Sequence, residues 1–185
     1  MDVVPPEPPL SDGVVSLRAW RADDAAELVA ALDGDEEVAR WLDSIPQPYT
    51  DADANAWLAQ TERAWAEGTS FPFAVLDAAT GRLLGGIGLR WSDRVNQVGE
   101  VGYWARGDVR GRGVTTRALR LVADWALGAA GCERLVVRAD TQNVPSQRVA
   151  ERAAFVREGI ERSARFSLRQ RRRVDFVVYS RLPSD

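Results

Sequence analysis

Residues 71–130 constrain the fold most strongly, because three β-like stretches are followed there by a glycine-rich loop and a long segment of helical periodicity. The β-like stretches, residues 71–76, 83–91 and 97–105, are rich in β-branched and aromatic residues and are separated by polar turns. They predict an antiparallel meander. Residues 114–130 then place apolar side chains on one helical face, so the whole pattern predicts a mixed α/β fold.

Predicted strands and helices lie on both sides of this region in the sequence. Residues 51–67 repeat apolar side chains at helical spacing, and Gly68 is expected to end that helix. Residues 1–12 hold four prolines and no periodicity, which predicts an extended lead-in before one domain over residues 13–185. The remaining expected elements are strands over residues 14–18, 134–139, 156–166 and 174–182 and helices over residues 21–32, 35–42 and 145–154.

The bulk composition limits the cellular location and the classes of partner that we expect. A chain of 185 residues with 45% hydrophobic residues is sufficient for one substantial core. Lys and Arg number 24 and Asp and Glu 27, so no global basic field favours a nucleic-acid partner. No apolar run approaches the roughly 18 residues of a membrane span, and the first residues lack the basic and apolar regions of a secretion signal. We therefore expect a cytoplasmic protein without a membrane partner.

The absence of histidine limits the chemistry. It removes Ser-His-Asp and Cys-His catalysis, histidine-ligated zinc and imidazole acid-base chemistry together. The single cysteine, Cys132, excludes an internal disulfide and a cysteine-cluster metal site, and we expect it to be a small buried residue. We expect no metal, so any catalysis must use carboxylates, hydroxyls, backbone dipoles or a cofactor.

The loop of residues 110–116, Arg-Gly-Arg-Gly-Val-Thr-Thr, lies between a predicted strand and a predicted helix. Free backbone N–H groups and the helix dipole at such a position form an anion site, although a plain strand-to-helix turn would also use these glycines. A nucleotide-binding P-loop is excluded because no lysine follows the glycines. A dinucleotide fingerprint is a weak match because Thr116 replaces its last glycine, and it would predict NAD binding.

Several motifs follow one another along the chain: Leu17-Arg-x-Trp-Arg-x-Asp-Asp24, Gly99-Glu-Val-Gly-Tyr-Trp104, Arg110-x-x-Gly113-x-Thr115, Asn143-x-x-Ser146-x-x-Val149 and Ala154-Phe-x-x-Glu-Gly159. Together they resemble those of the GNAT superfamily of N-acetyltransferases, in the branch of the ribosomal-protein-alanine N-acetyltransferases. The resemblance covers nearly the whole chain beyond residue 13, with Thr115 and Ala154 standing where the family has smaller residues. It implies one GNAT-like α/β domain, with a central, mostly antiparallel mixed sheet splayed at the acyl-CoA site and flanked by helices.

The resemblance also implies N-acyl transfer, with acetyl-CoA or another acyl-CoA as co-substrate and an amine as acceptor. Backbone groups of residues 102–105 would pair with the pantetheine arm and supply an N–H to the oxyanion, Asn143 would lie near that arm, and Thr116 could donate its hydroxyl to a phosphate oxygen. The expected cofactor-binding residues are Gly102, Tyr103, Trp104, Ala105, Arg110, Gly111, Arg112, Gly113, Val114, Thr115, Thr116 and Asn143.

Glu100 is the candidate general base. A protonated amine must lose a proton before it attacks a thioester, and a histidine-free chain offers mainly carboxylates for this step. Glu100 lies on the strand before the glycine loop among apolar neighbours, where it would face a cleft. The alternative is that strand alternation turns Glu100 to solvent as an ordinary surface charge.

Ser146 resembles the family's hydroxyl near the CoA sulfur, which would donate a proton or hydrogen bond to the leaving thiolate. Spacing alone favours a structural role, because Asn143-x-Pro145-Ser146 also reads as a helix start with Asn143 as the cap. Both roles stay open at this point, since a cap and a catalytic hydroxyl are compatible.

The acceptor is not fixed by the sequence, and a small molecule and a protein N-terminus are both open. Trp41 and Tyr49 are the candidates for substrate contact, because the resemblance puts their segment over the acceptor side. The basic run at residues 169–173 is expected to be a solvated hairpin turn, and otherwise a contact for an acidic or RNA-rich partner. Two other functions stay open, a non-catalytic acyl-CoA-binding module and an NAD-binding domain, and so does a homodimer.

Overall fold

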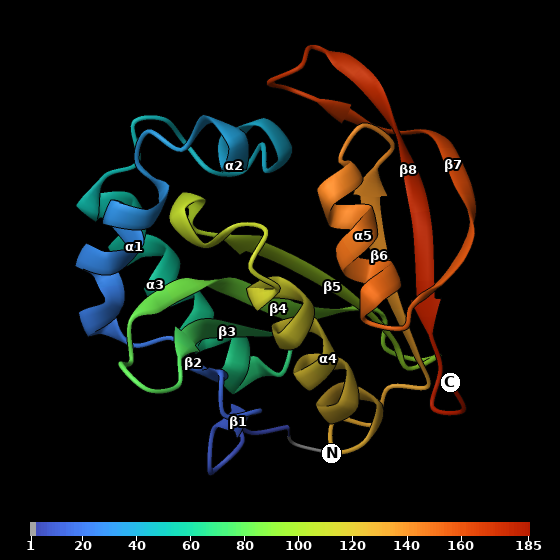
Figure 1. The fold of residues 1–185 in the computed structure, drawn as a ribbon, viewed down its shortest axis with the longest axis horizontal. Helices are drawn as coiled ribbons and strands as arrows, with labels where there is room; N and C mark the ends of the chain where they lie inside the picture. Colours follow the sequence, from blue (N-terminus) through green and yellow to red (C-terminus); the bar gives the residue numbers. More distant parts are fainter. Residues whose placement is uncertain (1–2) are drawn as a thin grey trace.

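The computed structural model describes residues 3–185, and within them eight strands form one sheet with helices on both faces (Figure 1). The strand order is β1-β2-β3-β4-β5-β6-β8-β7; β5 and β6 run parallel, and every other neighbouring pair runs antiparallel. The strands are β1 (Leu10–Ser11), β2 (Val15–Ala19), β3 (Ser70–Asp77), β4 (Leu83–Asp93), β5 (Val98–Ala105), β6 (Arg134–Asp140), β7 (Val156–Ser167) and β8 (Arg172–Arg181). The mostly antiparallel mixed sheet expected from the sequence is confirmed.

The helices divide between the two faces of the sheet. Phe73 and Ala74 are adjacent in β3 and therefore point to opposite faces. Phe73 belongs to the large core cluster with Leu119 of α4, whereas Ala74 belongs to the second cluster with Leu28 of α1 and residues of α3. The helices are α1 (Ala25–Leu32), α2 (Glu36–Trp41), α3 (Asp51–Glu67), α4 (Val114–Leu127) and α5 (Val144–Arg152), with 3-10 turns at Ala22–Asp24 and Gly107–Val109. None of the helices in residues 3–185 is long and apolar enough to cross a membrane.

The sheet splits between β5 and β6. These strands pair at Val98, Gly99 and Glu100, and no pairing is recorded beyond Glu100 although β5 continues to Ala105 and β6 to Asp140. The chain leaves β6 upward in Figure 1, returns through α5, and then forms the β7–β8 hairpin at the right. The split therefore opens beside α5, and the expected splay of the sheet is confirmed.

The structure departs from the sequence expectations at two boundaries. α4 ends at Leu127 rather than at residue 130, because the chain turns at Gly128 and the Ala130 N–H bonds back to the Trp125 carbonyl oxygen. Leu10 pairs with Leu17, so the sheet begins within the segment that was expected to be an extended lead-in. The domain boundary at residue 13 stays a prediction, and residues 1–2 lie outside the described part. Cys132 is buried as expected.

Candidate functional site

A cavity of about 1050 Å³ passes through the split in the sheet. Its walls come from both faces: Val101 and Tyr103 belong to the α4 and α5 side, whereas Glu100 and Gly102 alternate with them and face the opposite side. The cavity thus has two halves that meet at the split. The half beside α4 and α5, which we call the first half, is lined by the glycine loop and the start of α5. The other half is lined by α2, β4, β6, β7 and β8, and we call it the acceptor half because the resemblance puts the amine on this side.

The N-terminus of α4 lies at the first half of the cavity and has no side-chain cap. Its N-cap residue, Gly113, makes no side-chain cap hydrogen bond, and its first turn carries no acidic residue. By contrast, α3 begins with a Thr50 cap and two acidic residues in its first turn, which satisfy its own dipole. The first N–H groups of α4 are therefore available for an anionic ligand, as a diphosphate requires.

The two loop glycines are required by backbone conformation. Gly111 and Gly113 have φ values of 75° and 81°, in the left-handed region that β-carbons disfavour. A β-carbon built at either position would meet nothing within 4 Å, so protein crowding does not exclude one. Both residues line the cavity, and the open space beside their backbone lets a ligand come close.

Arg110 of the same loop turns away from the helix N-terminus and connects the loop to α2. Its guanidinium forms ion pairs with Asp35 and with Glu37, the latter at 3.0 Å, and its Nε donates to the Ala105 carbonyl oxygen at 3.2 Å. Asp35 also caps α2 by accepting from the Val38 N–H. Arg110 therefore links the glycine loop in the first half to α2 in the acceptor half.

This link predicts a coupling between Arg110 and Asp35. Asp35→Asn keeps a good N-cap residue but removes the charge, and Arg110→Gln removes the other charge. The side chains of Arg110 and Asp35 are only 28% and 12% exposed, so we expect a coupling free energy of about 1 kcal/mol between them in a double-mutant cycle. Urea unfolding of the two single variants and the double variant measures it. Strictly additive losses would contradict the link, and Arg112→Gln in the exposed part of the loop is the control.

Ser146 and Tyr103 place two hydroxyl groups at the split. The Tyr103 hydroxyl lies 3.1 Å from Ser146 Oγ and donates to the Ser146 carbonyl oxygen at 3.1 Å. Burial raises the pKa of Tyr103 to about 12, so this phenol stays protonated over the whole neutral range. Asn143 Oδ1 accepts from the Ser146 backbone N–H at 3.1 Å, which confirms Asn143 as the cap of α5. The Ser146 hydroxyl does not take part in that capping bond.

Glu100 lines the cavity on the acceptor side of the split. Its Oε2 accepts from Arg90 and from Arg138, each at 2.8 Å. Arg90 is the cross-strand partner of Glu100 in β4, and Arg138 lies on β6 across the split. Arg138 also pairs with Glu161 of β7 at 3.0 Å. Alternating charges from four strands, β4, β5, β6 and β7, therefore form a chain that passes over β8 and holds two carboxylates at the cavity wall.

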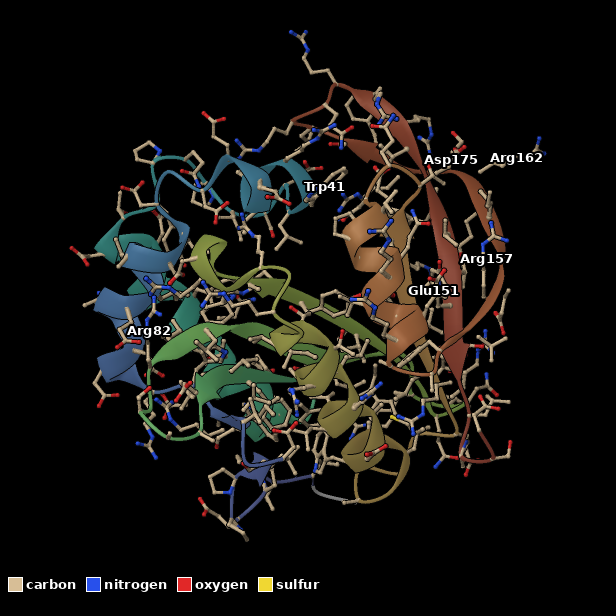
Figure 2. All side chains as sticks on the ribbon, viewed as in Figure 1. Trp41, Arg82, Glu151, Arg157, Arg162 and Asp175 are labelled. Atoms are coloured by element: carbon tan, nitrogen blue, oxygen red, sulfur yellow. The ribbon has the colours of Figure 1, made fainter. Side chains whose placement is uncertain are left out.

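The acceptor half is bridged by the β7–β8 hairpin. Asp43, in the loop after α2, accepts from Ser167 Oγ at 3.0 Å and from the Leu168 N–H at 3.1 Å, and Arg169 donates to the Ile45 carbonyl oxygen at 2.8 Å. We call this contact the arch. Figure 2 shows Trp41 on the side of α2 that faces α5 and the hairpin, and Trp41 lines the cavity beneath the arch. The Arg-rich turn is therefore partly packed against α2's loop rather than fully solvated.

Most of the residues predicted from the sequence meet in this cavity, and two lie elsewhere. Arg112 is exposed and is not among the described residues that line the cavity. Tyr49 is buried in the cluster that holds α1 and α3, because the Asp33 carboxylate fixes its backbone N–H there at 3.0 Å. The residues that the cavity brings together are Trp41, Glu100, Gly102, Tyr103, Trp104, Ala105, Arg110, Gly111, Gly113, Val114, Thr115, Thr116, Asn143 and Ser146.

Sequence reasoning missed the charged residues of the acceptor half, Arg90, Arg138, Glu161 and Arg165. One signal was present in the sequence for Arg138. An arginine in the middle of the otherwise apolar Leu-Val-Val-Arg-Ala strand marks a side chain that needs a partner or solvent on that face. Glu161 carries no comparable signal, because it reaches Arg138 only through the pairing of β7 with β8 and β8 with β6.

Comparisons with known proteins identify the family of the chain. Residues 15–156 match the family described as acetyltransferase (GNAT) domain. The chain is 28% identical over 147 residues to "Putative ribosomal N-acetyltransferase YdaF" of Bacillus subtilis, covering 78% of this chain and 79% of that protein. It is 29% identical over 84 residues to the ribosomal-protein-serine acetyltransferase of Escherichia coli, covering 45% and 47%.

Among solved structures, Mycobacterium smegmatis RimJ in complex with CoA-disulfide superimposes with a TM-score of 0.86 at 20% identity, covering 98% of this chain and 91% of that chain. This likeness shows the fold. The family match spans more than half of the chain and includes the glycine loop and Ser146. The chain therefore belongs to the GNAT acetyltransferases and is an acetyl-CoA-dependent N-acetyltransferase.

Proposed function

We propose that this chain transfers the acetyl group of acetyl-CoA to the α-amine at the N-terminus of a protein. One observation carries the proposal: a single cavity passes through the split sheet, with Ser146 on the α5 side and Glu100 on the opposite side. A thioester that enters from the first side and an amine that enters from the second would meet at the split. This arrangement suits direct attack of the amine on the thioester.

Acetyl-CoA would bind along the first half. Its diphosphate would lie against the N-terminus of α4 at Gly113, where the first N–H groups are uncapped. Its pantetheine arm would run along residues 102–105 of β5, since this edge of the strand is no longer paired with β6. A backbone N–H on that edge would also stabilise the oxyanion of the tetrahedral intermediate.

The chemical step would then use three side chains. Glu100 would accept a proton from the amine, directly or through a water molecule, while the nitrogen attacks the thioester carbon. The C–N bond forms, the C–S bond breaks, and the Ser146 hydroxyl would donate a proton to the leaving thiolate. Tyr103 lies 3.1 Å from that hydroxyl and stays protonated. Its O–H, which donates to the Ser146 carbonyl oxygen in the resting structure, would turn to Ser146 Oγ and return a proton to it. Solvent that enters the cavity would return a proton to Tyr103.

A protein N-terminus is favoured as acceptor by the names of two relatives. One is named as a ribosomal N-acetyltransferase and the other as a ribosomal-protein-serine acetyltransferase, and the latter name denotes a protein acceptor. The acceptor half also has walls from five elements, α2, β4, β6, β7 and β8. Such a site suits an acceptor larger than a simple amine.

A thiol-release assay with acetyl-CoA tests this function. The acceptors are a hexapeptide with a free N-terminus, the same peptide with a blocked N-terminus and one free lysine, and spermidine as a small amine. We expect turnover with the free N-terminus and at least tenfold lower kcat/KM with the other two. Turnover restricted to spermidine or to the lysine side chain would contradict the proposed acceptor.

A further inference from the structure

Two arginines of α5, Arg148 and Arg152, line the first half of the cavity and take no part in the proposed chemistry. They lie about one helical turn apart, or about 6 Å along the axis of α5. Pro145 and Val149 lie on the same helical face and line the same cavity, so this face of α5 is turned toward the cavity. Both arginines are exposed, and a ligand in the cavity can therefore reach them.

Neither of these two guanidinium groups forms an ion pair with a carboxylate of residues 3–185. Arg110, which also lines the cavity, differs because it pairs with Asp35 and Glu37. Arg117 of the neighbouring α4 pairs with Asp12 at 2.7 Å. Like charges one turn apart on a helix repel each other, so the two arginines of α5 destabilise the helix unless an anion lies beside them.

Glu151 lies between the two arginines in the sequence but is turned to another side of α5. Its Oε1 accepts from the Tyr179 hydroxyl of β8 at 3.0 Å. Figure 2 shows Glu151 on the side of α5 that faces β8. This carboxylate is therefore held away from the two guanidinium groups, and the face of α5 that lines the cavity keeps its positive charge.

The end of α5 lies close to the start of α4. Arg120 of α4 donates from its guanidinium to the Arg152 carbonyl oxygen, which places the last turn of α5 beside the second turn of α4. The uncapped N-terminus of α4 at Gly113 is about two turns before Arg120. Ser146, at the split, is about 9 Å before Arg152 along the axis of α5. The two arginines of α5 therefore lie on the far side of Ser146 from the start of the helix, toward α4.

The chemistry of acyl-CoA matches this placement. Besides its diphosphate, CoA carries a third phosphate at the 3′ position of the ribose that follows the diphosphate. With the diphosphate at Gly113 and the thioester at the split, this ribose would lie on the side of the diphosphate that is away from the split. Exposed guanidinium groups suit a phosphate there, because their paired N–H groups match its oxygen atoms.

From this charge and placement we infer that Arg148 and Arg152 bind the 3′-phosphate of acyl-CoA. The inference rests on the placement of acetyl-CoA in the first half that is proposed above. It adds a specificity for the acyl donor that the transfer chemistry does not require. A thioester without the 3′-phosphate, such as that of dephospho-CoA or of phosphopantetheine on a carrier protein, gains nothing from these arginines.

Calorimetric titration with CoA and with dephospho-CoA tests the inference. The wild-type chain should bind CoA about tenfold more tightly, because only CoA offers the phosphate to the two arginines. In the double variant Arg148→Gln/Arg152→Gln this ratio should fall to about one, through weaker binding of CoA, while the Kd for dephospho-CoA changes by less than about twofold.

The matched control is the double variant Arg157→Gln/Arg162→Gln, which removes the same number of positive charges. Both arginines are exposed, lie on β7 (Figure 2) and are outside the cavity lining, so the control should keep the wild-type ratio. An equal loss of the ratio in the control would show a general effect of charge and would overturn the inference. Equal affinities of the wild-type chain for the two ligands would also overturn it, as would an undiminished ratio in Arg148→Gln/Arg152→Gln.

Gly113→Asp tests the placement on which the inference rests. Aspartate is a good N-cap residue, and it would occupy the first N–H groups of α4 and bring a negative charge to them. The affinities for CoA and for dephospho-CoA should both fall, since both ligands carry the diphosphate. Unchanged affinities would overturn the placement together with the inference. Weaker binding of both ligands by Gly113→Asp, with an undiminished ratio in Arg148→Gln/Arg152→Gln, would overturn the inference alone.

Discussion

Glu100→Gln should lower kcat/KM for a peptide acceptor by about 100- to 10,000-fold while the affinity for acetyl-CoA stays unchanged. Glutamine keeps the size and polarity of the side chain but cannot accept the proton of an ammonium group. The carboxylate is well placed for this role, because both of its ion pairs use Oε2 and the second oxygen is the atom that would accept the proton. The affinity should persist because Glu100 lies on the acceptor side of the split.

The dependence of kcat/KM on pH is the decisive measurement for Glu100. With a base, the activity falls as the pH decreases through the pKa of that base, and without it this limb shifts or disappears. Glu161→Gln is the matched control, because Glu161 also lines the cavity and also pairs with Arg138. Both variants lose one ion pair of Arg138. Glu100→Gln also loses the pair with Arg90, whose side chain is 62% exposed, so this second pair should contribute little to stability. Superimposable pH profiles for Glu100→Gln and the wild-type chain would show that another group takes the proton.

The elements of the fold could be predicted because their determinants are local. Helical periodicity and Gly68 define α3, whose observed bounds are Asp51–Glu67. The β-branched and aromatic residues of three stretches, separated by polar turns, predict the antiparallel meander that β3, β4 and β5 form. The end of α4 was misplaced because alanine-rich residues 128–130 resemble helix, whereas Gly128 adopts φ −93° and ψ −88° and turns the chain.

The candidate site also has parts that the sequence could predict and parts that it could not. The glycine loop, the Glu100 strand and the start of α5 are sequence-local motifs, and the fold brings them to one cavity. The acceptor half depends on contacts between distant segments, such as Asp43 with Ser167, which are 124 residues apart. No local pattern records such a contact. Tyr49 shows that a local pattern can also mislead. An aromatic residue in this segment suits either the acceptor side or the core, and packing against α1 and α3 puts Tyr49 in the core.

The proposed action of the Ser146 hydroxyl on the leaving thiolate predicts that Ser146→Ala lowers kcat by about 10- to 1000-fold with little change in acetyl-CoA binding. A purely structural role predicts a different result. Asn143 caps α5 through the backbone N–H of Ser146, and alanine retains that group. The variant should therefore keep the helix start and the stability of the chain. Calorimetric binding of acetyl-CoA and steady-state kcat, measured on the same preparation, separate the two roles.

Tyr103→Phe tests the proposed proton transfer from Tyr103 to Ser146. Phenylalanine keeps the ring but removes the hydroxyl that lies 3.1 Å from Ser146 Oγ. If Tyr103 supplies protons to Ser146, its loss should lower kcat less than Ser146→Ala does, since water can reload the serine. The double variant should then be no slower than Ser146→Ala alone, because residues that act in one chain are not additive. Multiplicative losses in the double variant would show two independent roles, and an unchanged kcat in Ser146→Ala would leave Ser146 as a helix-start residue only.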